Sequence, residues 1–469
     1  MPNTIRTYNY LGGLLFLLLV LGAIFWAKER ILITDPAFYL FQIINDQKLL
    51  LAESRPVTII NQLLALFCVK AGMPLSTIVA VYSFSFVAVA FLFYTIINYI
   101  LKNQVAALTM LLILVTGMSK SYYRPTSESN LALFAGLLLY AWLEYSHAYR
   151  EHKQVVTWRY PIALLIIVLG YFSHPLAVFY LSFPLWFHAL DRQVWKEYHP
   201  LLLTAFLGFL FGSRILLADS ATHEGSIYAE LLVSPGALVD TLTSSYVLTF
   251  IRSYYVELYI PFTLILLIAI LRMMYLRYWS LLAYCTVFAV IYFCITCISY
   301  HRGESDMQME KILLPLTLFF GLPFSRFFLT HPSHKYMGAL VLTFLLLVGI
   351  TRIDNVRYLF HKRLEYYHAL MEQTQASGYR KTVVNPEHVQ RHLLRYHWAS
   401  GVESLLISSL DGPDSSSTLL ITDQTDRVKE SLAEPDKFIP IVGWTVGTLN
   451  ADYFSLPEVP YYVWVESFE

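Results

Sequence analysis

The chain has 469 residues, of which 57% are hydrophobic, 16% aromatic and only 14% charged, and its mean hydropathy is +0.53. An ordinary soluble domain carries about 25% charged residues, so this composition excludes that class. The 33 basic residues balance the 33 acidic ones, and the chain therefore lacks the positive field that favours nucleic-acid binding. The sequence predicts an integral membrane protein without a nucleic-acid partner.

Long apolar blocks recur along the chain between Tyr8 and Ile350. A helix that crosses a bilayer needs about 20 mainly apolar residues, so these blocks predict an all-α polytopic protein with about eleven transmembrane helices. The expected spans are Tyr8–Ala27, Ser76–Leu101, Gln104–Met118, Leu131–Tyr145, Tyr160–Phe172, Leu176–Leu190, Leu201–Leu217, Ile260–Met274, Trp279–Tyr300, Ile312–Phe328 and Lys335–Ile350.

The loop after the first span predicts two helices that lie on the membrane surface. The first is expected over Ala37–Leu51 and the second over Pro56–Gly72. Asn61, Gln62 and Lys70 interrupt the apolar pattern of the second helix. An amphipathic helix in the plane of the membrane accommodates such polar residues better than a span does.

The charges of the loops predict the orientation of the chain. With a cytoplasmic N-terminus, the loops on the cytoplasmic side are short and basic, as the positive-inside rule requires. The opposite loops, beginning with residues 28–75, are longer and carry most of the acids. The sequence therefore predicts a cytoplasmic N-terminus and an extracytoplasmic C-terminus. A bacterial inner membrane, with the C-terminus in the periplasm, fits this arrangement, and an endoplasmic reticulum membrane would give the same topology.

Residues 1–350 are expected to form the membrane module, and residues 351–469 a small soluble α+β domain outside the membrane. A charged helix is predicted over Tyr358–Gln375. Strands are predicted at Leu405–Ser409, Thr418–Thr422 and Tyr461–Trp464, with a turn-rich linker at Asp411–Ser417.

The candidate chemistry lies in the outer loops, because the interiors of the spans contain almost no ionisable residues. Ionisable groups inside the bilayer usually mark ion paths, so ion-coupled transport is disfavoured. Asp35 follows the first span in the run Thr34-Asp35-Pro36. Its carboxylate could accept a proton from an attacking hydroxyl. An Asp before Pro is also a common helix N-cap, and the two roles are compatible.

The second outer loop holds Tyr123, Arg124 and Glu128. Glu128 fits the first turn of the next helix, and it could also contact an acceptor or a divalent cation. Oxygen ligands from Asp35 and Glu128, completed by water and phosphate, would suit Mg²⁺ or Mn²⁺. Two acids alone do not specify a metal site.

A later outer loop begins at His301-Arg302 and reaches Lys311. Its basic groups are expected at the height of lipid phosphates, where charge-assisted contacts are strong. An ordinary charged loop at the membrane edge would have the same composition. His174 in a tight outer turn and Arg252 in a tyrosine-rich segment are further candidates for a substrate cleft.

This layout resembles the GT-C superfamily of integral-membrane glycosyltransferases. The resemblance depends on an acid early in a large first outer loop, on two surface helices, and on several short motifs. The matching residues are Asp35, the run from Arg55-Pro56 to Pro74-Leu75, Glu128, His174-Pro175 and the stretch Glu310–Pro315. The first loop has one Asp where the family often has an adjacent acidic pair, and Lys311 stands where an Arg is often found.

The resemblance implies inverting transfer of a sugar from a polyprenyl-phosphate carrier, such as undecaprenyl phosphate, to a lipid, glycan or protein acceptor. Asp35 would then deprotonate the acceptor hydroxyl, while Lys311, Arg302 and His301 would stabilise the departing phosphate. Two alternatives remain. An O-antigen-type polymerase or ligase would depend on arginines in the outer loops. A non-catalytic lipid transporter or scaffold would need neither Asp35 nor Lys311.

Overall fold

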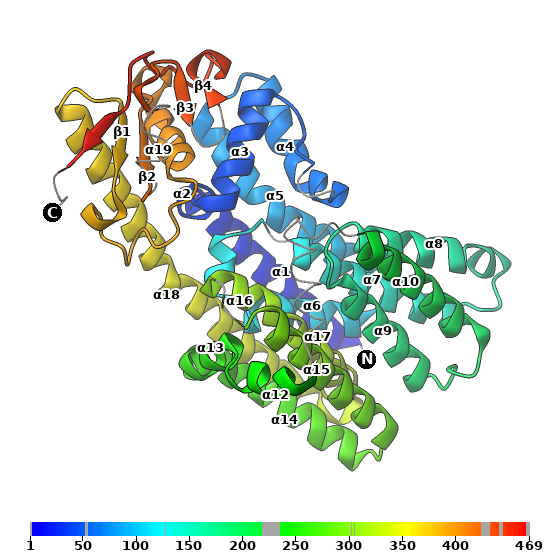
Figure 1. Cartoon of the computed structure of the whole chain (residues 1–469). Helices are drawn as coiled ribbons and strands as arrows, with labels where there is room; N and C mark the ends of the chain where they lie inside the picture. Colours follow the sequence, from blue (N-terminus) through cyan, green and yellow to red (C-terminus); the bar gives the residue numbers. More distant parts are fainter. Residues whose placement is uncertain are drawn as a thin grey trace.

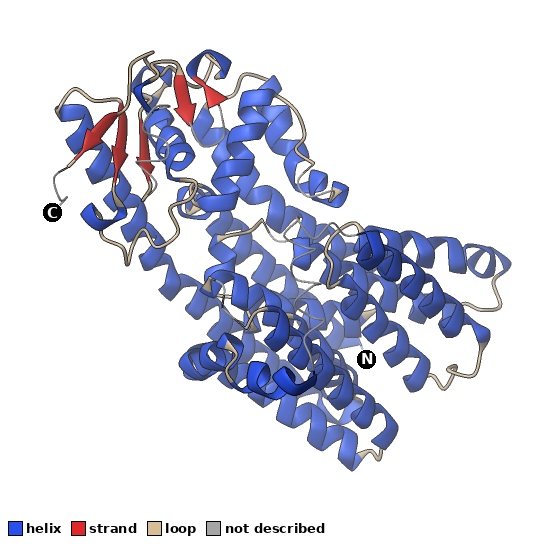
Figure 2. Ribbon diagram, in the orientation of Figure 1, coloured by secondary structure: helices blue, strands red, loops and turns tan. Residues whose placement is uncertain are grey.

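The computed structural model describes residues 2–51, 55–126, 128–217, 235–301, 303, 305–423, 432–439 and 444–465. Helices form most of this part of the chain, and Figure 2 shows its strands confined to one end of the molecule. The helical bundle and the small sheet domain are joined by one long helix, α18 (Lys335–Ala376), which Figure 1 shows running from one to the other.

A helix occurs at every position where a span was expected. The helices are α1 (Pro2–Phe25), α5 (Leu75–Thr95) with η3 (Ile96–Ile100), α6 (Gln104–Thr116), α7 (Glu128–Ala148), α8 (Lys153–Tyr171), α9 (Ala177–Asp191), α10 (Tyr198–Leu217), α14 (Ile260–Tyr275), α15 (Trp279–Ser299), α16 (Asp306–Leu313), α17 (Pro315–Phe324) with η6 (Ser325–Leu329), and α18. Among the described residues, 8 helical segments are long and apolar enough to cross a membrane. Their length and composition agree with the expected all-α polytopic protein, while spans at α6, α7 and α9 stay predictions.

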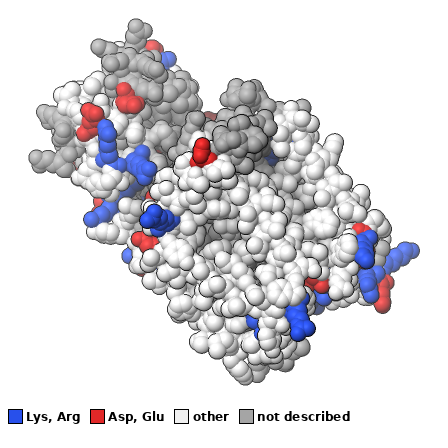
Figure 3. Space-filling model, turned by 60° about the horizontal axis from the view of Figure 1, so that its bottom comes forward, with Lys and Arg blue, Asp and Glu red and all other residues white. Residues whose placement is uncertain are grey.

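The bundle has a buried centre and an apolar exterior. Every residue of α6 from Ala106 to Thr116 is buried, and α17 packs against it. By contrast, α10 and α14 expose large apolar side chains, such as Phe209 at 70% and Leu271 at 62%. In Figure 3 the charged side chains lie mainly at opposite ends of the visible face, with a broad uncharged surface between them. Lipid chains are the solvent that such a surface suits.

The segment after α1 contains two helices where surface helices were expected, although the first ends at Asp46 and not at Leu51, and their place at a membrane surface stays a prediction. They are preceded by α2 (Ala27–Ile31), and they are α3 (Thr34–Asp46) and α4 (Ile59–Lys70), the latter entered through η2 (Pro56–Thr58). In α4 the apolar side chain of Phe67 is 66% exposed, whereas Asn61 and Gln62 are buried. This polarity is the reverse of that in a soluble amphipathic helix and suits a helix whose outer side touches lipid.

The start of α3 differs from the expectation in one respect that bears on function. The helix begins at Thr34, with Ile33 at the N-cap, so Asp35 lies in the first turn and is not the cap. The prediction of a capping role for Asp35 was wrong. Thr34 has φ +40°, a backbone conformation that is costly for a β-branched residue.

The C-terminal part is an α+β unit built on a parallel sheet. Its strands lie in the order β2 (Thr418–Ile421), β1 (Lys381–Val384), β5 (Tyr462–Trp464). The short β3 (Lys437–Ile439) and β4 (Trp444–Thr445) form an antiparallel pair. The predicted strands at Thr418–Thr422 and Tyr461–Trp464 are confirmed, and β1 was not predicted.

The predicted strand at Leu405–Ser409 was wrong, because Leu405 to Ser408 belong to the helix α19 (Ser400–Ser408). Every residue of α19 is buried, and it packs between β2 and α3. A short apolar run buried on all sides has no periodicity that separates strand from helix. The helix expected over Tyr358–Gln375 is part of α18, so the domain boundary expected after Ile350 falls inside a continuous helix.

The remaining described helices are short and lie within the connecting segments. They are η4 (Lys120–Tyr123), α12 (Pro235–Thr243), α13 (Tyr246–Tyr254), η5 (Tyr255–Tyr259), η7 (Pro332–His334), η8 (Pro386–His388), η9 (Ser409–Asp411), η10 (Pro413–Ser415) and η11 (Val446–Thr448). Arg352 on α18 ties η5 to the end of α6, because its guanidinium donates to the carbonyls of Thr116 (2.8 Å) and Leu258 (2.8 Å). This contact fixes the end of α6 where the second outer loop begins.

Candidate functional site

Asp35 faces an arginine from a different outer loop. Its carboxylate forms an ion pair with Arg124, which follows η4. The side chains are 25% and 13% exposed, so the pair lies at an accessible but sheltered position. Arg124 also contacts Ser305 Oγ at 3.4 Å, at the N-cap of α16. Arg124 therefore links the first, second and last outer loops.

A second ion pair forms between Arg55, just before η2, and Glu128, the first residue of α7. Arg55 Nη1 lies 3.4 Å from Glu128 Oε2, and the two side chains are 10% and 15% exposed. Glu128 thus occupies the helix-start position that the sequence predicted. At this position the carboxylate is also stabilised by the N-terminal end of the helix dipole.

His174 lies within reach of the same charges. Burial lowers the pKa of His174 well below its ordinary value, and the charges of Arg55, Arg214 and Lys311 lower it further. Its Nδ1 accepts a hydrogen bond from the Leu176 N–H at 3.1 Å. The imidazole is therefore neutral near pH 7 and does not add to the positive charge of the site.

Lys311, on the last turn of α16, is the buried cation of the site. It is 4% exposed and its Nζ donates to the Thr126 carbonyl at 3.3 Å. The charges of Arg124, Asp35 and Glu128 act on it. A buried ammonium with a single carbonyl partner retains hydrogen-bonding capacity for a further acceptor.

The neighbouring Glu310 holds the second outer loop in place. Its carboxylate accepts hydrogen bonds from the backbone N–H groups of Ser119 (3.0 Å), Lys120 (3.2 Å) and Ser121 (2.9 Å). Glu310 is 3% exposed. The same turn of α16 therefore supplies Lys311 and fixes the loop that carries Arg124.

A further cluster, formed by Lys120, Asp306 and Tyr254, borders the site. Lys120 Nζ lies 2.8 Å from Asp306 Oδ2, and the Tyr254 hydroxyl donates to the same oxygen at 2.7 Å. Burial lowers the pKa of Lys120, but the hydrogen bonds and charges of Asp306 and Tyr254 outweigh it and raise the pKa above its ordinary value. None of these residues was predicted to be a site residue.

The structure thus brings most of the predicted site residues into one cluster. These are Asp35, Arg55, Arg124, Glu128, His174 and Lys311. We call this set the outer cluster.

The other predicted residues lie differently. Tyr123 is fully buried and stacks on Phe360 with ring centroids 4.8 Å apart, so it belongs to the packing. The Nδ1 of His301 lies 3.1 Å from the Ile298 carbonyl. Arg252 is exposed on α13, and no contact among the described residues joins it to the outer cluster. Arg302 lies outside the described residues.

Sequence reasoning missed Glu403, which connects the C-terminal unit to Asp35. Glu403 is fully buried on α19. Its Oε1 accepts the Thr34 N–H at 2.5 Å, and its Oε2 accepts Arg363 Nη2 at 2.5 Å. Thr34 is the residue with the strained backbone immediately before Asp35. The one available indication was a lone acid within the apolar segment that ends in Leu405-Leu406-Ile407.

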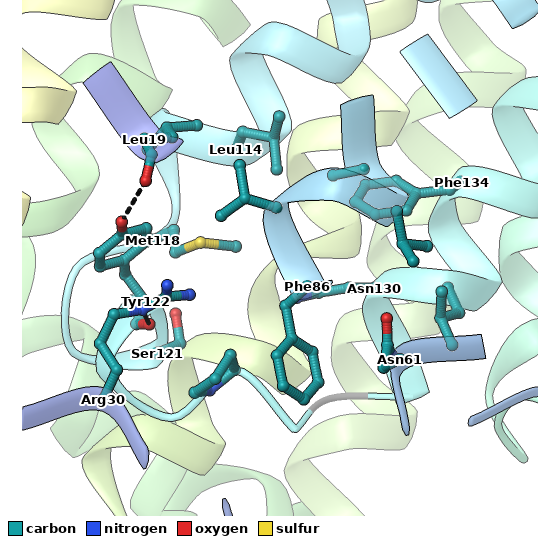
Figure 4. A pocket seen from close by; sticks show the side chains of 15 residues that line it. Leu19, Arg30, Asn61, Phe86, Leu114, Met118, Ser121, Tyr122, Asn130 and Phe134 are labelled. Carbon is teal, nitrogen blue, oxygen red and sulfur yellow. Dashed lines mark hydrogen bonds between the residues drawn. The ribbon is translucent and has the colours of Figure 1, made fainter. Parts of the chain in front are cut away.

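A largely apolar cavity of about 50 Å³ lies beside the outer cluster, between α1, α5, α7 and the second outer loop. Figure 4 shows Arg30, Asn61, Ser121 and Asn130 around it, together with aromatic and aliphatic side chains. Asn61 Oδ1, Ser121 Oγ and Asn130 Oδ1 are buried without a hydrogen-bond partner. A cavity with apolar walls and a few unsatisfied polar atoms suits part of an amphiphilic ligand.

Among the described residues, no group of three or more His, Cys, Asp or Glu side chains lies close enough together to hold a metal ion. Asp35 and Glu128, the two candidate ligands, each face an arginine. Comparison with known proteins adds no constraint, since no family model, curated protein or solved structure matches the chain. The functional argument therefore depends on the geometry of the site.

Proposed function

We propose that the protein is an inverting glycosyltransferase of the GT-C type in a bacterial inner membrane. It would move a sugar from a polyprenyl-phosphate carrier to a lipid, glycan or protein acceptor on the periplasmic face. The observation that carries this proposal is a partly exposed carboxylate, Asp35, among cations from separate loops, Arg124 and Lys311. Sugar transfer from a phosphate needs such a combination, because a base must activate the hydroxyl and positive charge must stabilise the leaving phosphate.

In the proposed step, the acceptor hydroxyl gives its proton to a carboxylate oxygen of Asp35 while the hydroxyl oxygen bonds to the anomeric carbon. The bond between that carbon and the phosphate oxygen breaks on the opposite side, so the configuration inverts. The carrier phosphate leaves with the electron pair. Lys311 and Arg124 stabilise the charge that it gains. The apolar surface of the bundle leaves the hydrocarbon chain of the carrier within the bilayer.

A divalent cation stays a prediction in this scheme. Asp35 and Glu128 would supply oxygen ligands only if they left their arginine partners, Arg124 and Arg55. Transfer assays with Mg²⁺, with Mn²⁺ and with EDTA measure the requirement directly. No step of the proposal is routed through the ion.

The experiment that tests the proposal is mass spectrometry of surface glycans and glycolipids in strains that carry the wild-type protein or Asp35→Asn. Asp46→Asn, at the exposed end of the same helix, is the matched control. With equal amounts of protein in the membrane, Asp35→Asn should lose one sugar mass and accumulate the unmodified acceptor. An unchanged profile would show that Asp35 is not the base.

An O-antigen-type polymerase or ligase is the second candidate, because two outer-loop arginines, Arg55 and Arg124, lie in the outer cluster. In that case Arg124→Lys should shorten or abolish the polymer, whereas Asp35→Asn should leave its length unchanged. A lipid transporter or scaffold would tolerate both substitutions without any change in glycan mass.

A further inference from the structure

A second cavity, of about 130 Å³, lies where the membrane bundle meets the C-terminal unit. Its walls come from α18, from the start of α16, from the second outer loop and from the segment that precedes α19. Ile33, two residues before Asp35, also lines it. The cavity is separate from the one in Figure 4, and no residue lines both.

Positive side chains dominate the polar lining of this cavity. Lys120, Arg363 and Arg395 line it together with the imidazole of His392, against Asp306 as the only acid among its described lining residues. Asp306 forms an ion pair with Lys120. Arg363 forms an ion pair with Glu403, which does not itself line the cavity.

Arg395 and His392 are exposed and have no ion-pair partner among the described residues. The Arg395 guanidinium lies 5.5 Å from the centre of the Tyr396 ring. Tyr396 also lines the cavity, and its hydroxyl interacts with the backbone of Asp306. Because Lys120 and Arg395 share the single carboxylate of Asp306, the recess has an excess of positive charge, which fits an anion with several acceptor oxygens.

The remaining wall is apolar. Leu359 and Phe360 come from α18, and Met307 comes from α16. Leu359 is 44% exposed, so its side chain remains available for contact. The position, on the helix that leaves the bundle, joins a charged recess to an apolar surface. A soluble anion needs only the charged recess, whereas an amphiphile uses both the recess and the apolar surface.

We propose that this cavity binds the phosphate head group of a membrane amphiphile, with Arg395 as the contacting cation, the His392 imidazole as a further hydrogen-bonding group and Leu359 against its apolar part. The proposal concerns binding and does not depend on the proposed transferase reaction. If the transferase proposal also holds, the site lies next to the segment that leads to Asp35 and would serve a phosphate-bearing substrate lipid.

The test measures binding to the purified full-length protein in a neutral detergent. The probes are dioctanoyl phosphatidic acid, dioctanoyl phosphatidylcholine as the zwitterionic counterpart, and inorganic phosphate. The variant His392→Gln/Arg395→Gln removes the exposed imidazole and the exposed guanidinium. Arg391→Gln is the matched control, since Arg391 is exposed on the same segment but does not line this cavity.

We expect the double variant to weaken phosphatidic acid binding about tenfold or more, because it removes charge-assisted hydrogen bonds. Arg391→Gln should leave the Kd unchanged, and phosphatidylcholine should bind more weakly than phosphatidic acid. Leu359→Asn should weaken binding of phosphatidic acid but not of inorganic phosphate.

Three results would overturn the proposal. Wild-type protein that binds none of the probes contradicts the site. Equal losses in Arg391→Gln and the double variant indicate diffuse surface charge. If inorganic phosphate binds as tightly as phosphatidic acid, the cavity does not select an amphiphilic ligand. Because no sugar donor is present in the assay, none of these results depends on whether the protein transfers sugar.

Discussion

Charge clusters lie at both ends of α7, and they differ in kind. At its start, Glu128 belongs to the outer cluster, which joins separate loops and lies beside a cavity. At its other end, Glu144 accepts a hydrogen bond from His188 Nδ1 at 2.6 Å and pairs with Arg192. This second cluster continues from Arg192, which follows α9, through Asp191 to Arg326 on η6.

The comparison teaches that a buried ion pair is not by itself evidence of a site. In the Glu144 cluster each charge is matched by a neighbour on a packed helix, so the cluster fixes the α7–α9 contact. In the outer cluster the charges come from segments far apart in the sequence. Its buried Lys311 has a carbonyl partner, and Asp35 stays partly exposed. Access does not separate the two ends, since Arg192 is 35% exposed. The capacity of Lys311 to bind a further acceptor does.

Neutralising one acid at each end of α7 tests the difference between the two clusters most directly. Asp35→Asn should lower the transfer rate by about 10²- to 10⁴-fold with little loss of stability, as expected for removal of a general base. Glu144→Gln should leave the transfer rate close to wild type but destabilise the fold by about 2 kcal/mol, because a buried imidazole and a guanidinium lose their acceptor. Transfer assays and thermal unfolding in the same detergent measure both effects.

If Glu144→Gln abolished transfer in a protein of normal stability, the two clusters would not differ in function. If Asp35→Asn unfolded the protein, the pair with Arg124 would be structural.

A second prediction concerns how the C-terminal unit acts on the outer cluster. Glu403→Gln removes the charge that holds both Arg363 and the strained Thr34, so the segment that presents Asp35 loses its anchor. We expect kcat to fall about tenfold with KM nearly unchanged, and stability to fall by about 3 kcal/mol, because Arg363 is left without its buried partner.

Glu365→Gln, at an exposed position on α18, is the control and should change neither quantity. Glu403→Asp keeps the charge and should recover part of kcat. A Glu403→Gln protein with normal kcat would show that Thr34 needs no anchor.

The sequence was informative where the membrane imposes strong composition rules. The apolar blocks located every helix of the bundle where a span was expected, and the loop positions of Asp35, Arg124 and Glu128 indicated which residues would meet. The sequence was least informative where contacts join distant segments. The apolar run beside Glu403 is as typical of a strand as of a helix. Nothing in the sequence around Thr34 predicts that a residue 369 positions away accepts its N–H.

The same limit explains the other missed features. The strand β1 is only four residues long and is identified by its partners β2 and β5, not by its composition. Lys120 and Asp306 are ordinary loop charges in the sequence, and only the packing of η4 against α16 makes them a pair. Tyr123 was expected in the cleft, but Phe360 of α18 stacks on it. Burial and pairing across helices depend on packing that no local pattern encodes.

The smallest effect we predict is a pH dependence of stability that originates at His174. Its pKa in the folded protein lies well below its ordinary value, so the unfolded chain binds more protons than the folded one as the pH falls below about 6.5. The stability associated with neutral His174 is complete above that pH and decreases toward the folded pKa.

His174→Gln removes this titration but keeps a polar side chain in the turn. Its melting temperature should therefore fall less than that of the wild type between pH 7 and pH 5, and His388→Gln, in the C-terminal unit, should behave as the wild type does. Parallel acid profiles for His174→Gln and the wild type would mean that neither burial nor the charges of Arg55 and Lys311 lower the pKa of His174. In that case the turn after α8 would not belong to the outer cluster, and the contrast between the two ends of α7 would be carried by Asp35, Arg124 and Glu128 alone.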